Sequence, residues 1–348
     1  MPNLFAFPPD SDPFPDALSR AGDAANHAAA RHVFAEYQAR RAPHTLRRHA
    51  GDLALLAEFL GAVGAPVGDL LHKPDAWRGI TWGLVSAWVA WMLQRGYAVT
   101  TVNARLSTVK LYAKLAAQAG ALTPEAYALI RTVSGYTHAE IAHVDAARAA
   151  ADLPTRMGSK KAESIVLTLS QVKALKRQPD TPQGRRDALL VCLMFDHGLR
   201  VGEIARLEVG AISLDVKTLT FYRPKVDAVQ THALTPSTMR AARAYLENDA
   251  PAEGRLLRAS LKSGQLTKTG MNERAITKRL NTLAKRIGVT GVSAHDGRHT
   301  WATRAARNHT DLFALQEAGG WNSLEMPRRY VEKHRIANAG VVLDDDEL

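Results

Sequence analysis

Apolar residues recur at helical spacing through the first part of the chain. In "PHTLRRHAGDLALLAEFLGAVG" the residues Leu46, Leu53, Leu56, Ala57 and Leu60 share one face. The stretches "TWGLVSAWVAWMLQRGY" and "TTVNARLSTVKLYAKLAAQAG" repeat the pattern. Short segments with Gly or Pro separate these stretches. We therefore predict several amphipathic helices that pack into a compact helical domain.

The periodic pattern weakens near the middle of the chain and then resumes. Pro154, Gly158 and the "SKK" cluster predict a linker at about 150–164. A helix capped by Thr168 or Ser170 is expected to begin the second domain. Two further helices flank the tight turn "DHGLR", in which Gly198 suits the end of the first one.

A change from helical spacing to alternation marks a small sheet in the second domain. "KTLTFYRPK" and "QTHALTP" predict two strands of a hairpin around "VDAV", and 236–330 again has a mainly helical pattern. The predicted fold is mainly α: a helical domain, then a mostly α domain with a small antiparallel β-sheet. The predicted segments are a flexible arm at 1–24, the helical domain at 25–149, the linker at 150–164, the second domain at 165–335 and a tail at 336–348.

Composition fits two globular domains in a basic protein. The chain has 348 residues, 46% of them apolar, and more residues than one hydrophobic core usually serves. Lys and Arg number 45 against 34 Asp and Glu, which gives a net charge of +11. Such a charge attracts polyanions, and nucleic acid is the commonest one. On charge alone, a soluble protein that merely happens to be basic explains the balance equally well.

The sequence favours a reducing compartment without a membrane. Cys192, the single cysteine, lies in the apolar run "ALLVCLMF" and is expected in the core. The N-terminal "MPNLFAFPPDSDPFPDALS" has neither the basic region nor the apolar run of a secretory signal. No apolar run approaches the roughly 20 residues of a membrane span. We expect a cytoplasmic protein.

The sequence lacks the motifs with which many enzymes carry out phosphoryl transfer or hydrolysis. The chain has no Walker loop, cysteine-rich zinc pattern, Gly-x-Ser-x-Gly elbow or carboxylate cluster for paired magnesium ions. Positive side chains would have to replace them. Arg200 opens a helix whose first turn holds Glu203, and His295 and Arg298 are three residues apart on a helix. Two arginines and an imidazole make a credible phosphate clamp.

Four short stretches then occur in order: "HGLRVGEIARL", "AHDGRHTWAT", "GGWNS" and "PRRYVE". Together they resemble the boxes of the tyrosine recombinase (phage integrase) family, and the resemblance covers the second domain as the catalytic domain. The first domain, with "APHTLRRHAGDLALLAEFL" and "VTTVNARLSTVKLY", resembles that family's core-binding domain less specifically.

The resemblance assigns roles to five residues. Arg200 resembles the first active-site arginine, and Glu203 resembles the acidic residue that supports it. His295 and Arg298 resemble the His-x-x-Arg pair, and Tyr330 lies where the nucleophile is expected. A tyrosine oxygen would attack phosphorus while preorganised donors neutralise the charge on the phosphoryl oxygens. His295 would accept or relay the phenol proton.

The remaining catalytic positions are less regular. Lys225 in the hairpin best matches the family's catalytic lysine, the acid for the departing 5′ oxygen, with Lys217 as the reserve candidate. Trp321 replaces a more usual histidine; its indole N–H can donate to a phosphate oxygen but cannot carry a proton. Gly297 stands before Arg298 where an apolar residue is more usual. Each of these residues also has an ordinary structural explanation, and for Lys225 an exposed hairpin charge is the strongest alternative.

The resemblance implies a site-specific DNA recombinase or integrase that works through a 3′-phosphotyrosine, without metal, ATP or other cofactor. It also implies double-stranded DNA as a partner and a tetramer assembled on DNA. Basic residues on the polar helix faces of the first domain are candidate DNA contacts: Arg47, Arg48, Arg105 and Lys110. The tail "IANAGVVLDDDEL" could dock on a neighbouring subunit, as such tails do in the family it resembles, or its acidic end could be a solvated terminus that limits nonspecific binding.

Two other functions stay open at this point. A type IB topoisomerase uses a similar tyrosine, arginines, lysine and histidine to relax DNA, and the first domain argues against it. A noncatalytic DNA-binding relative is the second alternative, and the complete set of candidate residues argues against that.

Overall fold

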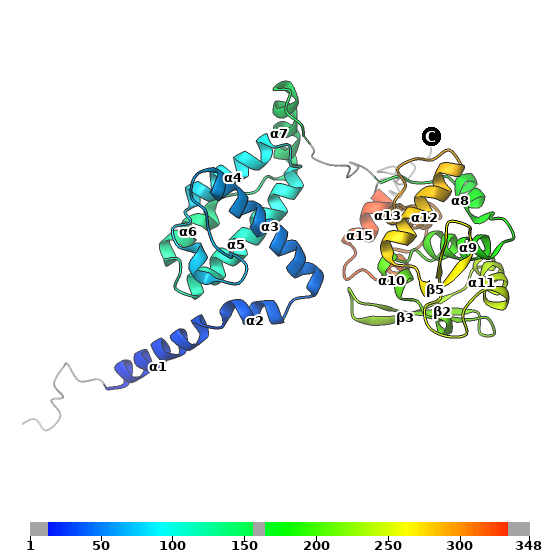
Figure 1. Cartoon of the computed structure of the whole chain (residues 1–348), viewed down its shortest axis with the longest axis horizontal. Coiled ribbons are helices and arrows are strands. Elements are labelled where there is room, and N and C mark those ends of the chain that lie inside the picture. The colour runs from blue at the N-terminus through cyan, green and yellow to red at the C-terminus, as the bar shows by residue number, and fades with distance from the viewer. Residues whose placement is uncertain (1–12, 156–163, 333–348) are drawn as a thin grey trace, which may run out of the picture. The chain divides into compact units, whose positions relative to one another are not determined.

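The computed structural model describes residues 13–155 and 164–332 (Figure 1). The chain divides into two compact units, Met1–Lys160 (unit 1) and Lys161–Leu348 (unit 2). This division falls within the predicted linker at 150–164. The predicted tail at 336–348 lies outside the described residues.

Unit 1 is helical throughout its described part, and its core uses the predicted apolar faces. Leu53, Leu56 and Leu60 of one helix and Val102 and Leu106 of another are buried together. The elements of unit 1 are α1 (Pro13–Ala30), α2 (Val33–Ala39), α3 (Pro43–Ala62), the 3-10 helix η1 (Pro74–Trp77), α4 (Trp82–Gln94), α5 (Val99–Gln118), α6 (Pro124–Thr132) and α7 (His138–Ala150).

The predicted arm at 1–24 needs a correction. Helix α1 begins at Pro13, so the second half of that segment is helical, while residues 1–12 lie outside the described part. Between Pro13 and Ala30 the sequence "DALSRAGDAANHAAA" is rich in alanine, the best helix former, and this outweighs the prolines that precede it.

Unit 2 is built around one buried helix. Its helices are α8 (Leu169–Lys176), α9 (Pro182–Phe195), α10 (Val201–Arg206), the 3-10 helix η2 (Val209–Ala211), α11 (Pro236–Asn248), α12 (Glu273–Arg286), α13 (Ala294–Arg307), α14 (Leu312–Gly319) and α15 (Glu325–Glu332). The run Leu189–Phe195 of α9 is entirely buried, and α8, α11 and α13 pack around it. Cys192 lies in this core as predicted, and burial raises the pKa of its thiol to about 12.

The predicted hairpin is part of a three-stranded antiparallel sheet with the order β1-β2-β3. Its strands are β1 (Ile212–Ser213), β2 (Thr218–Arg223) and β3 (Ala228–Ala233), and Arg223 pairs with Ala228 next to the hairpin turn. Leu219, Phe221 and Arg223 of β2 point to the buried side, while Thr220 and Tyr222 are exposed. This sheet confirms the predicted fold class.

A second, two-stranded sheet was not predicted. The strands β4 (Arg258–Ser260) and β5 (Leu266–Gly270) pair antiparallel inside the segment 236–330, which the sequence pattern assigned to helices. Strands of three and five residues are too short to show a clear alternation. The connection between them contains Gly264 at φ +92°, a conformation that favours glycine.

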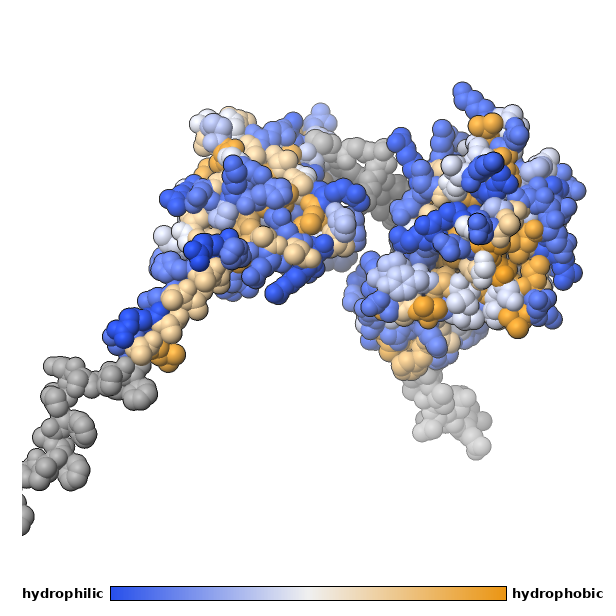
Figure 2. All heavy atoms as spheres, turned by 60° about the horizontal axis from the view of Figure 1, so that its bottom comes forward, coloured by the Kyte–Doolittle hydropathy of each residue, from blue (hydrophilic) through white to orange (hydrophobic). Residues whose placement is uncertain are grey.

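Hydrophilic side chains cover most of the face that Figure 2 shows on each unit, with apolar residues scattered among them. No helix within residues 13–155 and 164–332 is both long and apolar enough to cross a membrane.

Candidate active site

Arg200 is held at the start of α10 by a carboxylate in the first turn of that helix. The backbone N–H of Arg200 donates to Glu203 Oε2 at 2.8 Å, and its Nη1 donates to Glu203 Oε1 at 2.8 Å. Glu203 is buried, whereas the Arg200 side chain is 25% exposed. The carboxylate thus fixes the guanidinium while leaving part of it accessible.

Arg223 is a central residue that sequence reasoning missed. It is fully buried at the end of β2, and its Nη1 lies 3.4 Å from both carboxylate oxygens of Glu203. It also donates to the carbonyl oxygens of Gly319 at 3.0 Å and Ala318 at 2.8 Å, and its Nε donates to Gln230. One arginine therefore links strands β2 and β3, helix α10 and the end of α14.

Contacts with the segment before α8 fix the orientation of helix α13 about its own axis. Asp296 caps its own helix through Ser293 and also accepts from the backbone N–H of Ile165 at 2.9 Å. Gly297 packs against α9, since a Cβ there would lie 3.2 Å from Met194 Cβ. A side chain at position 297 would therefore require α9 to shift by a few tenths of an ångström.

Arg298 lies next to that glycine, nearly buried, and reaches across to two other segments. Its Nη1 donates to the carbonyl oxygen of Gly198 at 2.9 Å, and its Nη2 donates to that of Gly319. Its Cζ lies 4.4 Å from the ring centroid of Trp321. Burial, followed by the charges of Arg200 and Arg223, lowers the pKa of Arg298 to about 9, which leaves it protonated at neutral pH.

The "GGW" sequence allows these arginines and the indole to meet. Gly320 ends α14 in the left-handed conformation, at φ +56°, and a Cβ on it would lie 2.6 Å from Arg223 Cδ. A Cβ on Gly319 would lie 2.0 Å from Trp321 Cζ3. Arg200 Nη2 also donates to the carbonyl oxygen of Gly320, at 3.4 Å. Side chains at these two positions would separate the groups that the turn brings together.

Tyr330, on α15, is buried between aromatic rings and is only 5% exposed. The centroid of its ring lies 5.8 Å from that of Trp321 and 5.2 Å from that of His299. Burial raises the pKa of the Tyr330 phenol, and the positive charges of Arg298 and Arg200 act in the opposite direction. The structure thus brings the candidate site residues Arg200, Arg298, Trp321 and Tyr330 together.

His299 is the second residue that sequence reasoning missed. It lies one helical turn after His295 on α13, and the Nε2 atoms of the two rings are 3.0 Å apart. His295 is exposed, whereas His299 is half-buried and lies against the Tyr330 ring. The spacing of four residues along a helix was the available signal.

The electrostatics of this cluster favour an anion. The guanidinium groups of Arg200 and Arg223 pair with the buried carboxylate of Glu203, while Arg298 bonds to backbone carbonyl oxygens and is only weakly influenced by that carboxylate. Arg223 is itself buried, and desolvation lowers its pKa to about 10. Positive charge in excess of its counter-charge, in a site with little water, strongly attracts a phosphate group.

Lys225 lies in the β2–β3 turn and is exposed. The next residue, Val226, lines a cavity of about 330 Å³ together with Gln230, Gly320 and Trp321. The turn therefore borders the active-site loop, although in the described residues no hydrogen bond or ion pair joins Lys225 to the arginine cluster. Lys217 precedes β2 at the opposite end, so the six residues of the strand, roughly 20 Å, separate it from Arg223.

The candidate DNA contacts in unit 1 differ in how they are bound. Arg48 and Arg105 both reach the buried Asp52, at 3.3 and 3.5 Å, and the Lys110 ammonium donates to the carbonyl oxygen of Arg131. Arg48 is nevertheless half exposed, and Arg47 is exposed on the same helix. Arg48 also lines a cleft of about 530 Å³ with Arg40 and Arg41, whereas Arg105 and Lys110 are not among the residues that line it.

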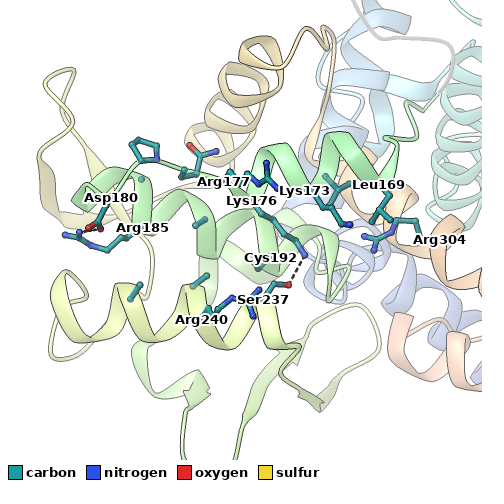
Figure 3. Close-up of a pocket in the computed structure, with 17 residues that line it drawn as sticks. Leu169, Lys173, Lys176, Arg177, Asp180, Arg185, Cys192, Ser237, Arg240 and Arg304 are labelled. Carbon is teal, nitrogen blue, oxygen red and sulfur yellow. Dashed lines mark hydrogen bonds and ion pairs between the residues drawn. The ribbon is translucent and has the colours of Figure 1, made fainter.

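A different basic cavity lies elsewhere in unit 2, beside α8, α9 and α11. Its volume is about 730 Å³. Its cationic lining residues are Lys173, Lys176, Arg177, Arg185, Arg240 and Arg304 (Figure 3). Lys176 pairs with Asp196 at 2.6 Å, and Arg185 pairs with Asp249 at 2.6 Å. None of the predicted catalytic residues lines this cavity.

Comparison with known protein families gives one match that coincides with unit 2. Residues 166–335 match the model described as "Phage integrase family". These residues contain all the elements from α8 to α15 and all the predicted catalytic residues.

Curated relatives extend the similarity to unit 1. The chain is 28% identical to tyrosine recombinase XerD of Lacticaseibacillus casei over 189 residues, 51% of this chain and 63% of that protein. It is 25% identical to tyrosine recombinase XerC of Mycobacterium sp. (strain JLS) over 299 residues, 83% of this chain and 88% of that protein. The chain thus covers less than two thirds of the first of these relatives and most of the second.

Two solved structures share the fold. The integrase of transposon Tn1549 in complex with transposon right end DNA has a TM-score of 0.58 at 15% identity, with 86% of this chain and 94% of that chain covered. A lambda integrase dimer bound to a COC′ core site has a TM-score of 0.56 at 15% identity, with 86% and 96% covered.

Proposed function

Because the chain belongs to the tyrosine recombinase (phage integrase) family, we propose that it is a site-specific recombinase that cuts and rejoins DNA through a 3′-phosphotyrosine. The observation that carries this proposal is the position of Tyr330. Its buried phenol lies beside Trp321, and the positive charges of Arg298 and Arg200 act on it. A tyrosine in such a site can attack an anionic electrophile that the arginines bind. For a member of this family, that electrophile is a DNA phosphodiester.

The reaction exchanges one phosphodiester for another. The Tyr330 oxygen bonds to phosphorus, the bond from phosphorus to the 5′ oxygen breaks, and the protein keeps a 3′-phosphotyrosine. Negative charge grows on the two nonbridging oxygens during this step. Arg200, Arg298 and the indole N–H of Trp321 supply donors for them. Since the covalent intermediate conserves the phosphoester bond, religation needs no ATP.

Two protons must move in the same step. His295 lies against His299, whose ring lies against Tyr330, and is the proposed acceptor or relay for the phenol proton. Lys225 is the proposed donor to the departing 5′ oxygen, because its turn borders the loop that carries Trp321. Lys217, at the far end of β2, is less suitable for that role.

Unit 1 is the proposed core-binding domain, and a tetramer on two DNA sites is the proposed working assembly. The cleft that Arg40, Arg41 and Arg48 line, with the exposed Arg47 on the same helix as Arg48, is a suitable place for a phosphate backbone. Phosphate contacts of this kind give affinity and salt dependence, while base contacts choose the site.

Covalent trapping tests the function. Inverted repeats around a short spacer in the DNA beside the gene would supply a candidate site. On a duplex of that site nicked beside the cleavage position, the departing strand diffuses away and the wild-type protein should accumulate an adduct that survives denaturation. Tyr330→Phe should form none, because it keeps the ring but lacks the nucleophile.

Two further measurements on the wild-type protein, plasmid relaxation and binding to the site, distinguish the alternative functions. Relaxation of supercoiled plasmid without any preferred sequence would favour a type IB topoisomerase. Tight binding to the site with no adduct from the wild type would favour a noncatalytic DNA-binding relative.

A further inference from the structure

A row of three rings connects the buried nucleophile with the protein surface. The ring centroids of Tyr330 and His299 are 5.2 Å apart, and those of His299 and His295 are 4.6 Å apart. Exposure rises along the row, from buried Tyr330 through half-buried His299 to exposed His295. His299 therefore lies between the Tyr330 phenol and His295, the residue to which the family resemblance assigns the role of proton acceptor or relay.

The contact between the two histidines constrains their tautomers. Their Nε2 atoms are 3.0 Å apart, so one Nε2 carries a hydrogen and the other presents a lone pair. If His299 donates, its own Nδ1 presents a lone pair and can take a new proton. If His295 donates, the neutral His299 ring has its hydrogen on Nδ1, and Nδ1 then has no lone pair with which to take a proton. Only the first arrangement can carry a proton from Tyr330 outward.

We propose that His299 takes the phenol proton of Tyr330 and passes a proton on to His295. The proposal rests on the proposed function, because it concerns the step in which Tyr330 attacks. The O–H bond of Tyr330 breaks as its oxygen bonds to phosphorus, and the proton binds His299 Nδ1. The hydrogen on His299 Nε2 moves to His295 Nε2. Exposed His295 then releases the hydrogen on its Nδ1 to water, and religation reverses these transfers.

The surrounding charges make two histidines more suitable than one. Burial raises the pKa of the Tyr330 phenol, so it keeps its proton at neutral pH until a base removes it. His299 lies against Tyr330, on whose phenol the positive charges of Arg298 and Arg200 act, so a lasting positive charge on His299 would be unfavourable. Asp296 of the same helix is buried and accepts from the backbone N–H groups of Ser293 and Ile165. Transfer to exposed His295 moves the charge to where water screens it.

The rate of adduct formation under single-turnover conditions on the nicked duplex tests the relay. His299→Phe keeps an aromatic ring beside Tyr330 but cannot hold a proton, and should slow the step by about 10²-fold or more. His299→Gln keeps polar contacts and should be slowed similarly. His295→Phe should be slowed less, since His299 can still accept a proton. His143→Phe, an exposed site on α7, should keep the wild-type rate.

A chemical rescue separates proton transfer from packing. Replacing Tyr330 by 2,3,5-trifluorotyrosine gives a phenol that ionises far more easily, so a base is no longer needed. The fluorinated His299→Phe protein should then recover most of the lost rate, which a packing defect could not do.

Three results would overturn the relay. They are an undiminished rate in His299→Phe, an absence of rescue by trifluorotyrosine, and a larger defect in His295→Phe than in His299→Phe. In each of these the wild type still forms the adduct, so the proposed function stands. An absence of the wild-type adduct would instead overturn the proposed function, and the relay with it.

Discussion

Arg223 Nη1 lies 3.0 Å from the carbonyl oxygen of Gly319, although the two residues are 96 positions apart in the chain. The same guanidinium reaches the carboxylate that orients Arg200. It is fully buried, so it cannot touch DNA itself. Its contacts fix the loop that carries Trp321 relative to Arg200.

Arg223→Met should therefore weaken both stability and cleavage. Removing one partner of a buried ion pair typically costs about 3–5 kcal/mol, because the other charge stays buried. Denaturant unfolding of the full chain should show this loss in the transition of unit 2. Arg243→Met is the matched control: its pair with Glu247 is 3.8 Å long and mostly exposed, so the change should be under about 1 kcal/mol. Equal effects of the two variants would contradict the role given to Arg223.

Gly320→Ala should damage the site without removing any functional group. The residue has φ +56°, and its new Cβ would lie 2.6 Å from Arg223 Cδ. Strain and displaced packing of this kind cost about 1–3 kcal/mol. The adduct rate should fall, since Trp321 follows directly. Gly210→Ala, where a Cβ meets nothing within 4 Å, should leave that rate unchanged. A fully active Gly320→Ala protein would show that the loop has more freedom than we infer.

Arg200→Ala and Arg298→Ala should separate cleavage from binding. Each removes a donor aimed at charge that grows in the transition state, so adduct formation should slow by about 10²–10³-fold. Site binding should change little, because the proposed DNA contacts of unit 1 are unaltered. Filter or gel-shift binding beside single-turnover cleavage measures both quantities. Equal losses in binding and in cleavage would indicate that these arginines only hold the DNA in place.

The sequence predicted most of the helices, because amphipathic spacing determines which helix faces are buried. The four boxes, through their resemblance to a family, named Arg200, His295, Arg298 and Tyr330 as candidate site residues. The β4–β5 pair escaped prediction because its strands are short. The first 12 of the 18 residues of α1 were assigned to the arm, because Pro13 and Pro15 precede the alanine-rich stretch.

Arg223 and His299 were missed for a different reason: their importance comes from residues distant in the chain. Alternation along β2 does place Arg223 on the same side as Leu219 and Phe221, and this register was a usable signal. Because arginine is seldom fully buried, the alternation alone does not predict that Arg223 lies on the buried side of the strand. Only the tertiary structure shows the carbonyl oxygens of α14 that make its burial possible.

The basic residues of unit 1 should differ in what their loss changes. Arg47→Ala and Arg41→Ala remove exposed charges, so each should lower the dependence of DNA affinity on salt by about one unit of slope. Arg105→Ala should instead lower the stability of unit 1, since this residue pairs with buried Asp52 and covers Tyr97. Binding titrations at several salt concentrations, together with unfolding curves, test the distinction. A salt slope reduced only by Arg105→Ala would contradict it.

The identity of the DNA-linked residue tests the central claim most directly. After the nicked duplex has reacted, nuclease and protease digestion should leave one modified peptide, from the stretch "RYVEK", for mass spectrometry. We predict a nucleotide joined through its 3′ phosphate to the oxygen of Tyr330. Attachment to another residue, such as the exposed Tyr222, or attachment through a 5′ phosphate, would contradict the mechanism.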